Sequence, residues 1–232
     1  MSAAAAPRAD RAPSSGRAEV TGAILAGGRA TRYGGLPKGL ERVGGERIVD
    51  RVAAALRAVS DELLLVANDA GAGDWLPGVR TVPDVQPGLG GLGGIHAALA
   101  HSGGAVVVVA WDMPFVPASL LAELVSLGGA GDADAAVPES DSKRGLEPLC
   151  AYYGAACLGA VERRLAAGDR RVVAFYDDVR VARLGADAVA RHGDPRRIFL
   201  NVNTPDDLAR AEVHLVEAHA PTTDGGRDRP EA

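Results

Sequence analysis

Apolar runs and amphipathic stretches alternate along the chain from residue 20 to residue 218. Short runs rich in β-branched residues predict strands at residues 20–25, 62–67, 79–82, 105–110, 134–137, 149–153, 172–175 and 179–184. Apolar positions at helical spacing predict helices at residues 48–59, 95–102, 117–127, 157–167 and 205–218. Strands that alternate with helices around a continuous apolar run at 105–110 indicate a mostly parallel, Rossmann-like sheet between two helical layers. We therefore expect a three-layer α/β/α sandwich.

The last predicted helix has a well-marked start. Thr204 is a good N-cap residue, and Pro205 suits the first helical turn. Two carboxylates, Asp206 and Asp207, follow at the positive end of the helix dipole. In open α/β sheets, ligands bind beyond the carboxyl ends of the parallel strands. We therefore expect the chemistry of this protein in the loops that follow its strands.

Composition narrows the classes of protein to which the chain can belong. Its 47% hydrophobic and 24% charged residues are typical of a globular protein. Its net charge of −5 argues against a protein that mainly binds nucleic acid. No apolar run has the length of a membrane span. Residues 1–18 and 220–232 lack apolar periodicity, so we expect two disordered tails around one domain at 19–219. Two cysteines, Cys150 and Cys157, fit a cytoplasmic location rather than a disulfide scaffold.

A glycine-rich loop with basic residues follows the first predicted strand. It reads LAGGRATRYGGLPK from Leu25 to Lys38. Glycines allow backbone N–H groups to approach an anion closely, and Arg and Lys side chains supply charge for phosphates. Lys38 is one of only two lysines in the chain, although the loop lacks the G-x-x-x-x-G-K-[ST] pattern of a P-loop. These residues favour a phosphate site, while composition alone leaves open an ordinary surface turn.

Two aspartates stand where predicted strands end. Asp112 follows the apolar strand 105–110, and Asp84 follows the strand 79–82. A carboxylate at the end of a buried strand is well placed to hold Mg²⁺ toward a ligand crevice. The alternatives are an aspartate at a helix entry for Asp112 and a turn-forming aspartate for Asp84.

A second glycine run, at residues 88–94, contains a formal G-x-G-x-x-G pattern. A dinucleotide-binding fingerprint needs an apolar strand that leads straight into the first glycine, and Pro83 and Pro87 interrupt such a strand here. The spacing of cysteines and histidines does not fit a zinc site, and no G-x-S-x-G nucleophile elbow occurs. The sequence therefore disfavours dinucleotide binding, zinc binding and serine-nucleophile hydrolysis.

Several motifs together carry a resemblance to a known family. The loop LAGGRATRYGGLPKGL resembles the signature of nucleotidyltransferases that build activated nucleotides on an α/β fold. FLNVNTPDDL at 199–208 and GDRRV at 168–172 are similar to segments of molybdenum cofactor guanylyltransferases. The double glycine at 27–28 matches the guanylyl branch, since related cytidylyl enzymes tend to read L-A-A-G. The resemblance covers residues 20–208 and implies a sheet of the nucleotidyltransferase type.

The resemblance also implies roles for individual residues. Lys38 and Arg32 would hold the triphosphate, and Asp112 would coordinate Mg²⁺; these three are the expected catalytic residues. The glycine run at 88–94 matches a family glycine stretch that precedes a helix near the base and substrate. The residues expected at the nucleotide are Leu25, Ala26, Gly27, Gly28, Lys38, Asn68, Asp84 and Asp112. The residues expected at the acceptor are Arg170, Arg171, Asn201 and Asn203, and the alternative for the two asparagines is to complete the coordination shell of Mg²⁺.

The function implied by the resemblance is transfer of GMP from GTP to molybdopterin, with Mg²⁺ as cofactor and release of pyrophosphate. Two alternatives would use the same residues. One is a different nucleotidyl transfer, of CMP to molybdopterin or of a nucleotide to a sugar phosphate, and the other is nucleotide binding without catalysis. The expected partners are GTP and molybdopterin as substrates, together with molybdoenzymes or cofactor-delivery proteins, and neither nucleic acid nor a membrane.

Overall fold

The computed structural model describes residues 19–27 and 37–219. The two predicted tails and most of the first glycine loop, 28–36, lie outside these ranges. The strands are β1 (Val20–Leu25), β2 (Arg42–Val43), β3 (Glu46–Arg47), β4 (Glu62–Val66), β5 (Arg80–Val82), β6 (Ala105–Ala110), β7 (Ala135–Pro138), β8 (Cys150–Tyr153) and β9 (Val181–Leu184). The α-helices are α1 (Ile48–Arg57), α2 (Gly90–Ser102), α3 (Ala118–Gly129), α4 (Cys157–Ala166), α5 (Ala186–Ala190), α6 (Pro195–Ile198) and α7 (Pro205–His219). Short 3₁₀ helices are η1 (Lys38–Leu40), η2 (Ala72–Asp74) and η3 (Tyr176–Asp178).

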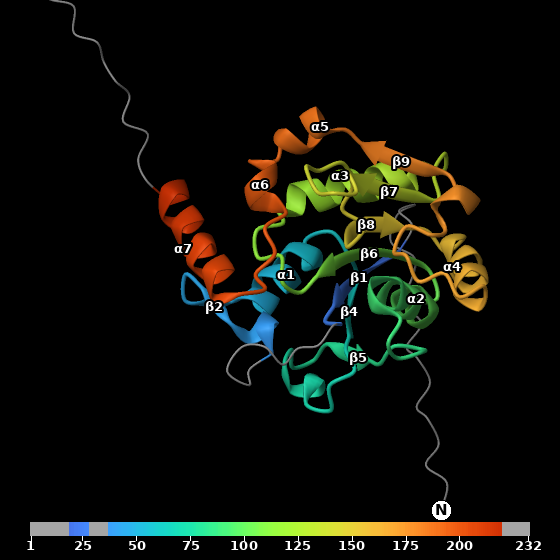
Figure 1. Cartoon of the computed structure of the whole chain (residues 1–232), viewed down its shortest axis with the longest axis horizontal. Helices are drawn as coiled ribbons and strands as arrows, with labels where there is room; N and C mark the ends of the chain where they lie inside the picture. Colours follow the sequence, from blue (N-terminus) through green and yellow to red (C-terminus); the bar gives the residue numbers. More distant parts are fainter. Residues whose placement is uncertain (1–18, 28–36, 220–232) are drawn as a thin grey trace, which may run out of the picture.

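One sheet dominates the described part of the chain (Figure 1). Its strand order is β5-β4-β1-β6-β8-β7-β9, and β2 and β3 form a separate hairpin. Neighbouring strands pair in parallel except at β8, which runs antiparallel to both β6 and β7. The prediction of a mostly parallel sheet is therefore confirmed. From β1 the chain moves outward to β4 and β5 and then returns to place β6 on the other side of β1, which makes the β1–β6 boundary the switch point where such sheets bind ligands.

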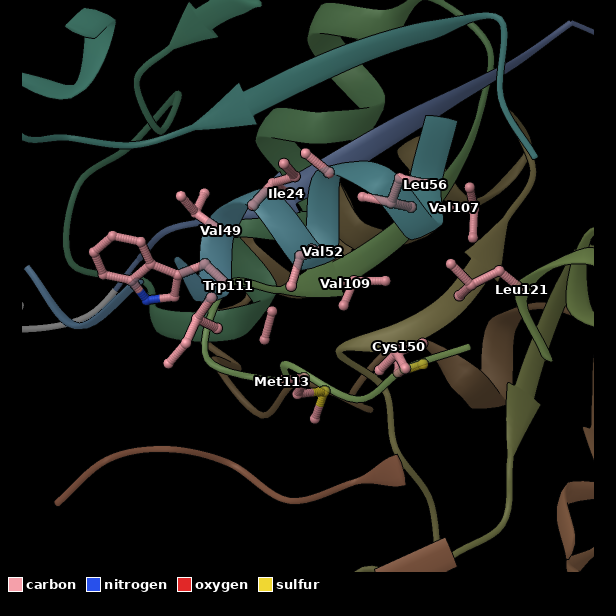
Figure 2. Packing of buried hydrophobic residues seen from close by; sticks show 14 of the residues in the cluster. Ile24, Val49, Val52, Leu56, Val107, Val109, Trp111, Met113, Leu121 and Cys150 are labelled. Atoms are coloured by element: carbon pink, nitrogen blue, oxygen red, sulfur yellow. The ribbon is translucent and has the colours of Figure 1, made fainter. Parts of the chain in front are cut away.

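Helices cover both faces of this sheet and complete the predicted three layers. Helices α1 and α3 pack on one face, and α2 and α4 pack on the other. Figure 2 shows Val49, Val52 and Leu56 of α1 turned toward Ile24 of β1 and Val109 of β6. Complete burial of each such side chain contributes about 1.5–3 kcal/mol. This packing fixes the two strands whose ends form the switch point.

Burial of β6 on both faces of the sheet explains why its sequence lacks alternation of polar and apolar residues. Val107 and Val109 belong to the core that α1 and α3 cover, and Val106 and Val108 belong to the core under α2 and α4. All four valines are fully buried. A strand that is covered on both faces reads as a continuous apolar run, and its predicted bounds agree with those of β6.

Helix α2 begins at Gly90, earlier than the predicted start at residue 95, so the glycines form its first turn instead of preceding it. Glycine is a poor helix former, but this turn lies against other parts of the core. A Cβ at Gly91 would lie 3.1 Å from Leu149 Cδ2, and one at Gly94 would lie 3.5 Å from Leu25 Cδ1. Close packing therefore outweighs local propensity here.

The predicted strand at residues 172–175 is wrong, since these residues form turns. Phe175 is nevertheless fully buried, with its ring 5.6 Å from that of Tyr153 and 5.0 Å from that of Tyr176. The apolar residues of this segment thus serve the core without pairing to a strand. None of the described helices is long and apolar enough to cross a membrane. Cys150 and Cys157 are buried free thiols.

The contact between α3 and β8 yields a prediction about stability. A Cβ on Gly128 would overlap the ring of Tyr152, whereas one on Gly129 would meet open space. We expect Gly128→Ala to lower the free energy of unfolding by about 1–3 kcal/mol, because the ring must move. The matched control, Gly129→Ala, should raise it by up to about 1 kcal/mol through helix propensity. Urea denaturation measures both changes, and unchanged stability of Gly128→Ala would refute the close contact.

Candidate active site

A hollow opens at the switch point, beyond the carboxyl ends of β1, β4, β5 and β6. It is lined by Leu25, Gly27, Val66, Asp84, Gly90, Gly91, Gly94, Ala110, Trp111, Asp112, Leu149 and Asn201. Most of this wall is apolar side chain or glycine, and Asp84, Asp112 and Asn201 supply its polar side chains. A largely apolar wall with a few polar groups is typical of a small-molecule site.

Backbone hydrogen bonds extend the sheet slightly past the ends of the strands. The N–H of Trp111 donates to the Leu25 carbonyl at 3.2 Å, and the N–H of Ala26 donates to the Val66 carbonyl at 2.9 Å. The N–H of Ala67 donates to Val82 at 2.9 Å. The loops that line the hollow therefore leave the sheet from fixed positions.

Three predicted site residues meet at this edge although they come from distant parts of the chain. The Lys38 ammonium donates to Oδ1 of Asn203 at 2.5 Å. The side chain of Asn203 is also close enough to the Asp112 carboxyl to lower its pKa. Because the amide oxygen accepts from the lysine, the amide nitrogen is the group that remains as a donor on the side of the aspartate. Asn203 thus bridges a cation and an anion.

Burial gives Asp112 an unusual electrostatic setting. Removal from water raises the pKa of its carboxyl, because burial disfavours the charged form. The charge of Lys38 and the side chain of Asn203 act in the opposite direction and lower the pKa. The effect of burial is the larger one, so the pKa of Asp112 lies above its usual range.

A close contact between Gly39 and Trp111 keeps Lys38 and Asp112 near each other. Gly39 follows Lys38 in η1, and Trp111 precedes Asp112. A Cβ at Gly39 would overlap the indole ring of Trp111, so only glycine allows this approach. The Trp111 ring is itself buried and stacks on Trp75 with centroids 5.1 Å apart. Gly39 and Trp111 were not among the predicted site residues, and their sequence signal is their position directly beside Lys38 and Asp112.

Asn68 and Asp84 also come together. Nδ2 of Asn68 donates to the Asp84 carboxylate at 2.8 Å, and the N–H of Asp84 donates to Oδ1 of Asn68 at 2.9 Å. Asp84 lines the hollow, and Asn68 orients it from the neighbouring strand end. Their predicted contacts with a nucleotide stay predictions.

The first turn of α2 faces the hollow through Gly90 and Gly91. The N-cap residue, Leu89, provides no side-chain hydrogen bond to this turn. The positive end of a helix dipole and its first N–H groups form a favourable place for an anion. The arrangement therefore suits a phosphate.

A second hollow lies at the same edge of the sheet and shares Asn201 with the first. It is lined by Ser140, Asp141, Ser142, Glu147, Pro195, Arg196, Phe199, Leu200, Asn201 and Arg210. Ser140 donates to Glu147 at 2.7 Å, and Nδ2 of Asn201 donates to the Phe199 carbonyl at 3.0 Å. This bond uses one of the two N–H groups of Asn201, so its amide oxygen and its second N–H are left for a ligand.

Other predicted site residues lie apart or outside the described ranges. Arg171 forms an ion pair with Asp169 at 2.6 Å, and this partner lowers the pKa of Asp169 to about 2. Neither Arg170 nor Arg171 lines either hollow, although Val172 lies next to Gly91. Gly28 and Arg32 are outside the described residues. Their assigned roles stay predictions.

The polar groups of the first hollow fit a hard cation that keeps some water. No group of three or more His, Cys, Asp and Glu side chains in residues 19–27 and 37–219 could form a metal site by itself. Asp112 supplies a carboxylate and Asn201 an amide oxygen, both oxygen ligands of the kind that Mg²⁺ takes. Mg²⁺ often uses one or two carboxylates and draws further ligands from water and substrate phosphates. The donor set is therefore compatible with a nucleotide-borne Mg²⁺.

Comparison with known proteins decides the family. The family described as the MobA-like NTP transferase domain matches residues 22–181. The chain belongs to this family. A probable molybdenum cofactor guanylyltransferase from Pelotomaculum thermopropionicum is 39% identical over 196 residues, which cover 84% of this chain and 93% of the relative. A molybdenum cofactor guanylyltransferase from Desulfosudis oleivorans is 36% identical over 201 residues, which cover 84% and 96% of the two chains.

A solved structure of a MobA-like protein agrees with this assignment. Molybdopterin-guanine dinucleotide biosynthesis protein A from Archaeoglobus fulgidus is 30% identical and superposes with a TM-score of 0.71, covering 85% of this chain and 99% of that one. This chain is thus a nucleotidyltransferase of the MobA-like family, whose members generally use a divalent metal ion. The fold predicted from the resemblance is confirmed.

The Gly39–Trp111 contact yields a prediction for this MobA-like enzyme. Gly39→Ala should push η1 away from Trp111 and displace Lys38 from Asn203. We expect nucleotidyl transfer to fall by about tenfold or more, since small displacements of a positioned group are costly. Gly73→Ala is the matched control, because Gly73 lies in the middle of η2 with open space around its Cα. Steady-state rates of the two variants test this, and equal rates would show that the close approach is unimportant.

Proposed function

We propose that this protein transfers GMP from GTP to molybdopterin and releases pyrophosphate. The observation that carries the proposal is the Lys38–Asn203–Asp112 bridge beside the hollow at the switch point. It combines a cation for phosphates with a carboxylate for a divalent ion. The names of the relatives support guanine as the base and the molybdenum cofactor as the product.

The nucleotide would occupy the first hollow. Its base and ribose would lie against the end of β1, at Leu25, Ala26 and Gly27, with Asp84 on the opposite wall. Its phosphates would lie between the first turn of α2 and the ammonium of Lys38. Both groups are positive, and Asn203 holds the ammonium in place while the turn is part of helix α2, so little reorganisation is needed when the anion binds.

The reaction needs positioning more than acid–base chemistry. An oxygen of the terminal phosphate of molybdopterin attacks the α-phosphorus of GTP and forms a new P–O bond. The bond from the α-phosphorus to the oxygen that bridges to the β-phosphate breaks, and pyrophosphate leaves with the bonding electrons. Because the attacking oxygen is already anionic, the protein supplies no strong base. Lys38 offsets the charge that accumulates on the leaving pyrophosphate.

Asp112 and Asn201 would hold the Mg²⁺ of the nucleotide. When bound there, the ion would neutralise phosphate oxygens and raise the electrophilicity of the phosphorus. Asn203 keeps the lysine and the aspartate close to each other before substrate arrives. This preorganisation brings two polyanions together at a modest electrostatic cost.

The second hollow would take the acceptor. It adjoins the first through Asn201, so an acceptor bound there can direct its phosphate toward the nucleotide. Arg196 and Arg210 offer positive charge, and Glu147 offers a hydrogen-bond acceptor for N–H groups of a heterocycle. Arg170 and Arg171 are additional candidates for the acceptor phosphate when it approaches.

Asp112 provides the sharpest test of the metal role. Asp112→Asn keeps the shape and one oxygen of the side chain but removes the charge that a hard divalent cation requires. Turnover should fall at least about a hundredfold, and the Mg²⁺ activation curve should shift to higher concentration. Asp74→Asn, at an exposed aspartate of η2, is the control. An unchanged Mg²⁺ titration of Asp112→Asn would mean that Asp112 is not the metal ligand.

Nucleotide choice tests the proposed substrate. A site built to pair the N–H groups of guanine leaves buried acceptors unpaired when cytosine binds, which disfavours the wrong base. We expect GTP to bind at least about tenfold more tightly than CTP, a difference of about 1.4 kcal/mol. Thermal stabilisation by each nucleoside triphosphate with Mg²⁺ measures the preference, and pyrophosphate release in the presence of molybdopterin measures turnover.

The other outcomes of this experiment have defined meanings. Equal stabilisation by GTP and CTP, or turnover with CTP, would point to a cytidylyl transfer. Turnover only with a sugar phosphate as acceptor would point to sugar-nucleotide synthesis. Tight GTP binding without pyrophosphate release for any acceptor would identify a nucleotide-binding protein that is not an enzyme.

A further inference from the structure

Asp207 is a buried carboxylate that the proposed reaction does not use. Among the described residues, it and His96 are the buried polar or charged side chains. Its neighbour Asp206, one position earlier in the same first turn of α7, is exposed. The helix dipole favours a carboxylate at either position. The dipole therefore does not explain why one of the two is buried.

The hydrogen bonds of Asp207 are concentrated on the segment that leads into α7. One carboxylate oxygen accepts from the N–H of Thr204 at 2.9 Å and from the N–H of Asn203 at 3.0 Å. The N–H of Asp207 donates back to the Thr204 hydroxyl at 3.1 Å, which completes a capping box. Arg210 donates to the other carboxylate oxygen. Burial acts to raise the pKa of Asp207, but these hydrogen bonds outweigh it and hold the pKa below its usual range.

The bonds to Asp207 fix the backbone of Asn203 on its C-terminal side, toward α7. A further bond fixes the backbone on its N-terminal side, at Val202. The N–H of Val202 donates to the backbone carbonyl of Asp112 at 2.8 Å. Asn203 is therefore held between the end of β6 and the first turn of α7. Its side chain leaves this anchored backbone to bridge Lys38 and Asp112.

Helix α7 also supports the other end of the bridge. Figure 1 shows α7 beside β2, the strand that follows η1 and Lys38. The N–H of Gly44, at the turn of this hairpin, donates to Glu212 at 2.9 Å. A Cβ on Gly44 would lie 2.6 Å from Leu215 Cδ1, so the helix and the hairpin are in close contact. One helix thus braces the segments that carry Lys38 and Asn203.

A cap alone would not require this carboxylate. Thr204 already satisfies one first-turn N–H, and a neutral side chain could accept the remaining bonds. The carboxylate of Asp207 adds a pair of strong, charge-assisted bonds from the backbone N–H groups of residues 203 and 204.

We infer that Asp207 is a positioning residue of the active site: its carboxylate caps α7 in order to fix the backbone of Asn203, and thereby holds the Asn203 amide between Lys38 and Asp112. This inference rests on the proposed function and deepens it, because it names the element that sets the geometry of the phosphate site. Asp207 itself lines neither hollow, and its contact with the lining of the second is its bond from Arg210.

The experiment compares Asp207→Ala with the matched variant Asp206→Ala in the full-length protein. Both remove a carboxylate from the same turn, but only the first releases the backbone of Asn203. We expect Asp207→Ala to lower kcat by at least about tenfold, with KM for GTP within about twofold of wild type, because positioning acts mainly on the chemical step. Asp206→Ala should keep wild-type kcat. Asp207→Asn, which keeps an acceptor oxygen but loses the charge, should retain part of the activity that Asp207→Ala loses.

A double-mutant cycle separates positioning from a general structural role. In an Asn203→Ala background, Asp207→Ala should cause no further loss of kcat, because the residue through which it acts is gone. A further loss of the same size as in wild type would overturn the inference. So would wild-type kcat in Asp207→Ala. Assays are run well below the melting temperature of each variant, which is measured in parallel.

A readout that needs no turnover keeps this test independent of the proposed function. The side-chain amide signals of Asn203 in a ¹⁵N-correlated spectrum are assigned by their loss in Asn203→Ala. We expect these signals to shift and broaden in Asp207→Ala but not in Asp206→Ala. If wild type lacks pyrophosphate release while the signals respond in this way, the proposed function fails and the positioning role stands. Unchanged signals in Asp207→Ala would overturn the positioning role whatever the activity.

Discussion

A carboxylate that is half-buried at the end of an apolar strand ionises more readily when a positive charge is held next to it. Asp112 is such a group, and Lys38 provides the charge through the Asn203 amide. This arrangement brings together three segments that are distant in sequence. It also explains the close contact of Gly39 with Trp111, because the lysine turn must approach the strand end without a side chain between them. A triphosphate with its metal ion would satisfy the same charges from the open side.

The topology of the sheet determines where this group can act. The parallel strands β1 and β6 end side by side, with helices on both faces, so their loops are the open route to the strand ends. The antiparallel strand β8 begins at this edge, since Cys150 pairs with Val109 near the end of β6. The residues just before it therefore separate the two hollows, with Leu149 in one and Glu147 in the other. A donor and an acceptor can meet at Asn201 between them.

The sequence predicted correctly the elements whose local residue pattern agrees with their packing in the fold. The continuous valine run gave the bounds of β6, because a strand covered on both faces needs no polar residues. The start of α2 was missed because glycine disfavours a helix, and the contacts with Leu25 and Leu149 that compensate are visible only in three dimensions. Lys38, Asp112 and Asn203 were each predicted at the site, but their bridge was not. Asp207 was predicted only as one of two carboxylates at the positive end of the helix dipole, because its bonds to the backbone of residues 203 and 204 are visible only in three dimensions.

The bond between Lys38 and Asn203 joins residues that are 165 positions apart. During synthesis on the ribosome, the chain delivers β1, β4, β5 and β6 well before residue 203. Long-range contacts form only after the intervening chain has been made and its loop closed. A nascent chain can therefore bury its first parallel strands while its phosphate site is still incomplete. The site gains its geometry only when α7 docks, so a nucleotide meets a finished pocket only on molecules that have been translated as far as this helix.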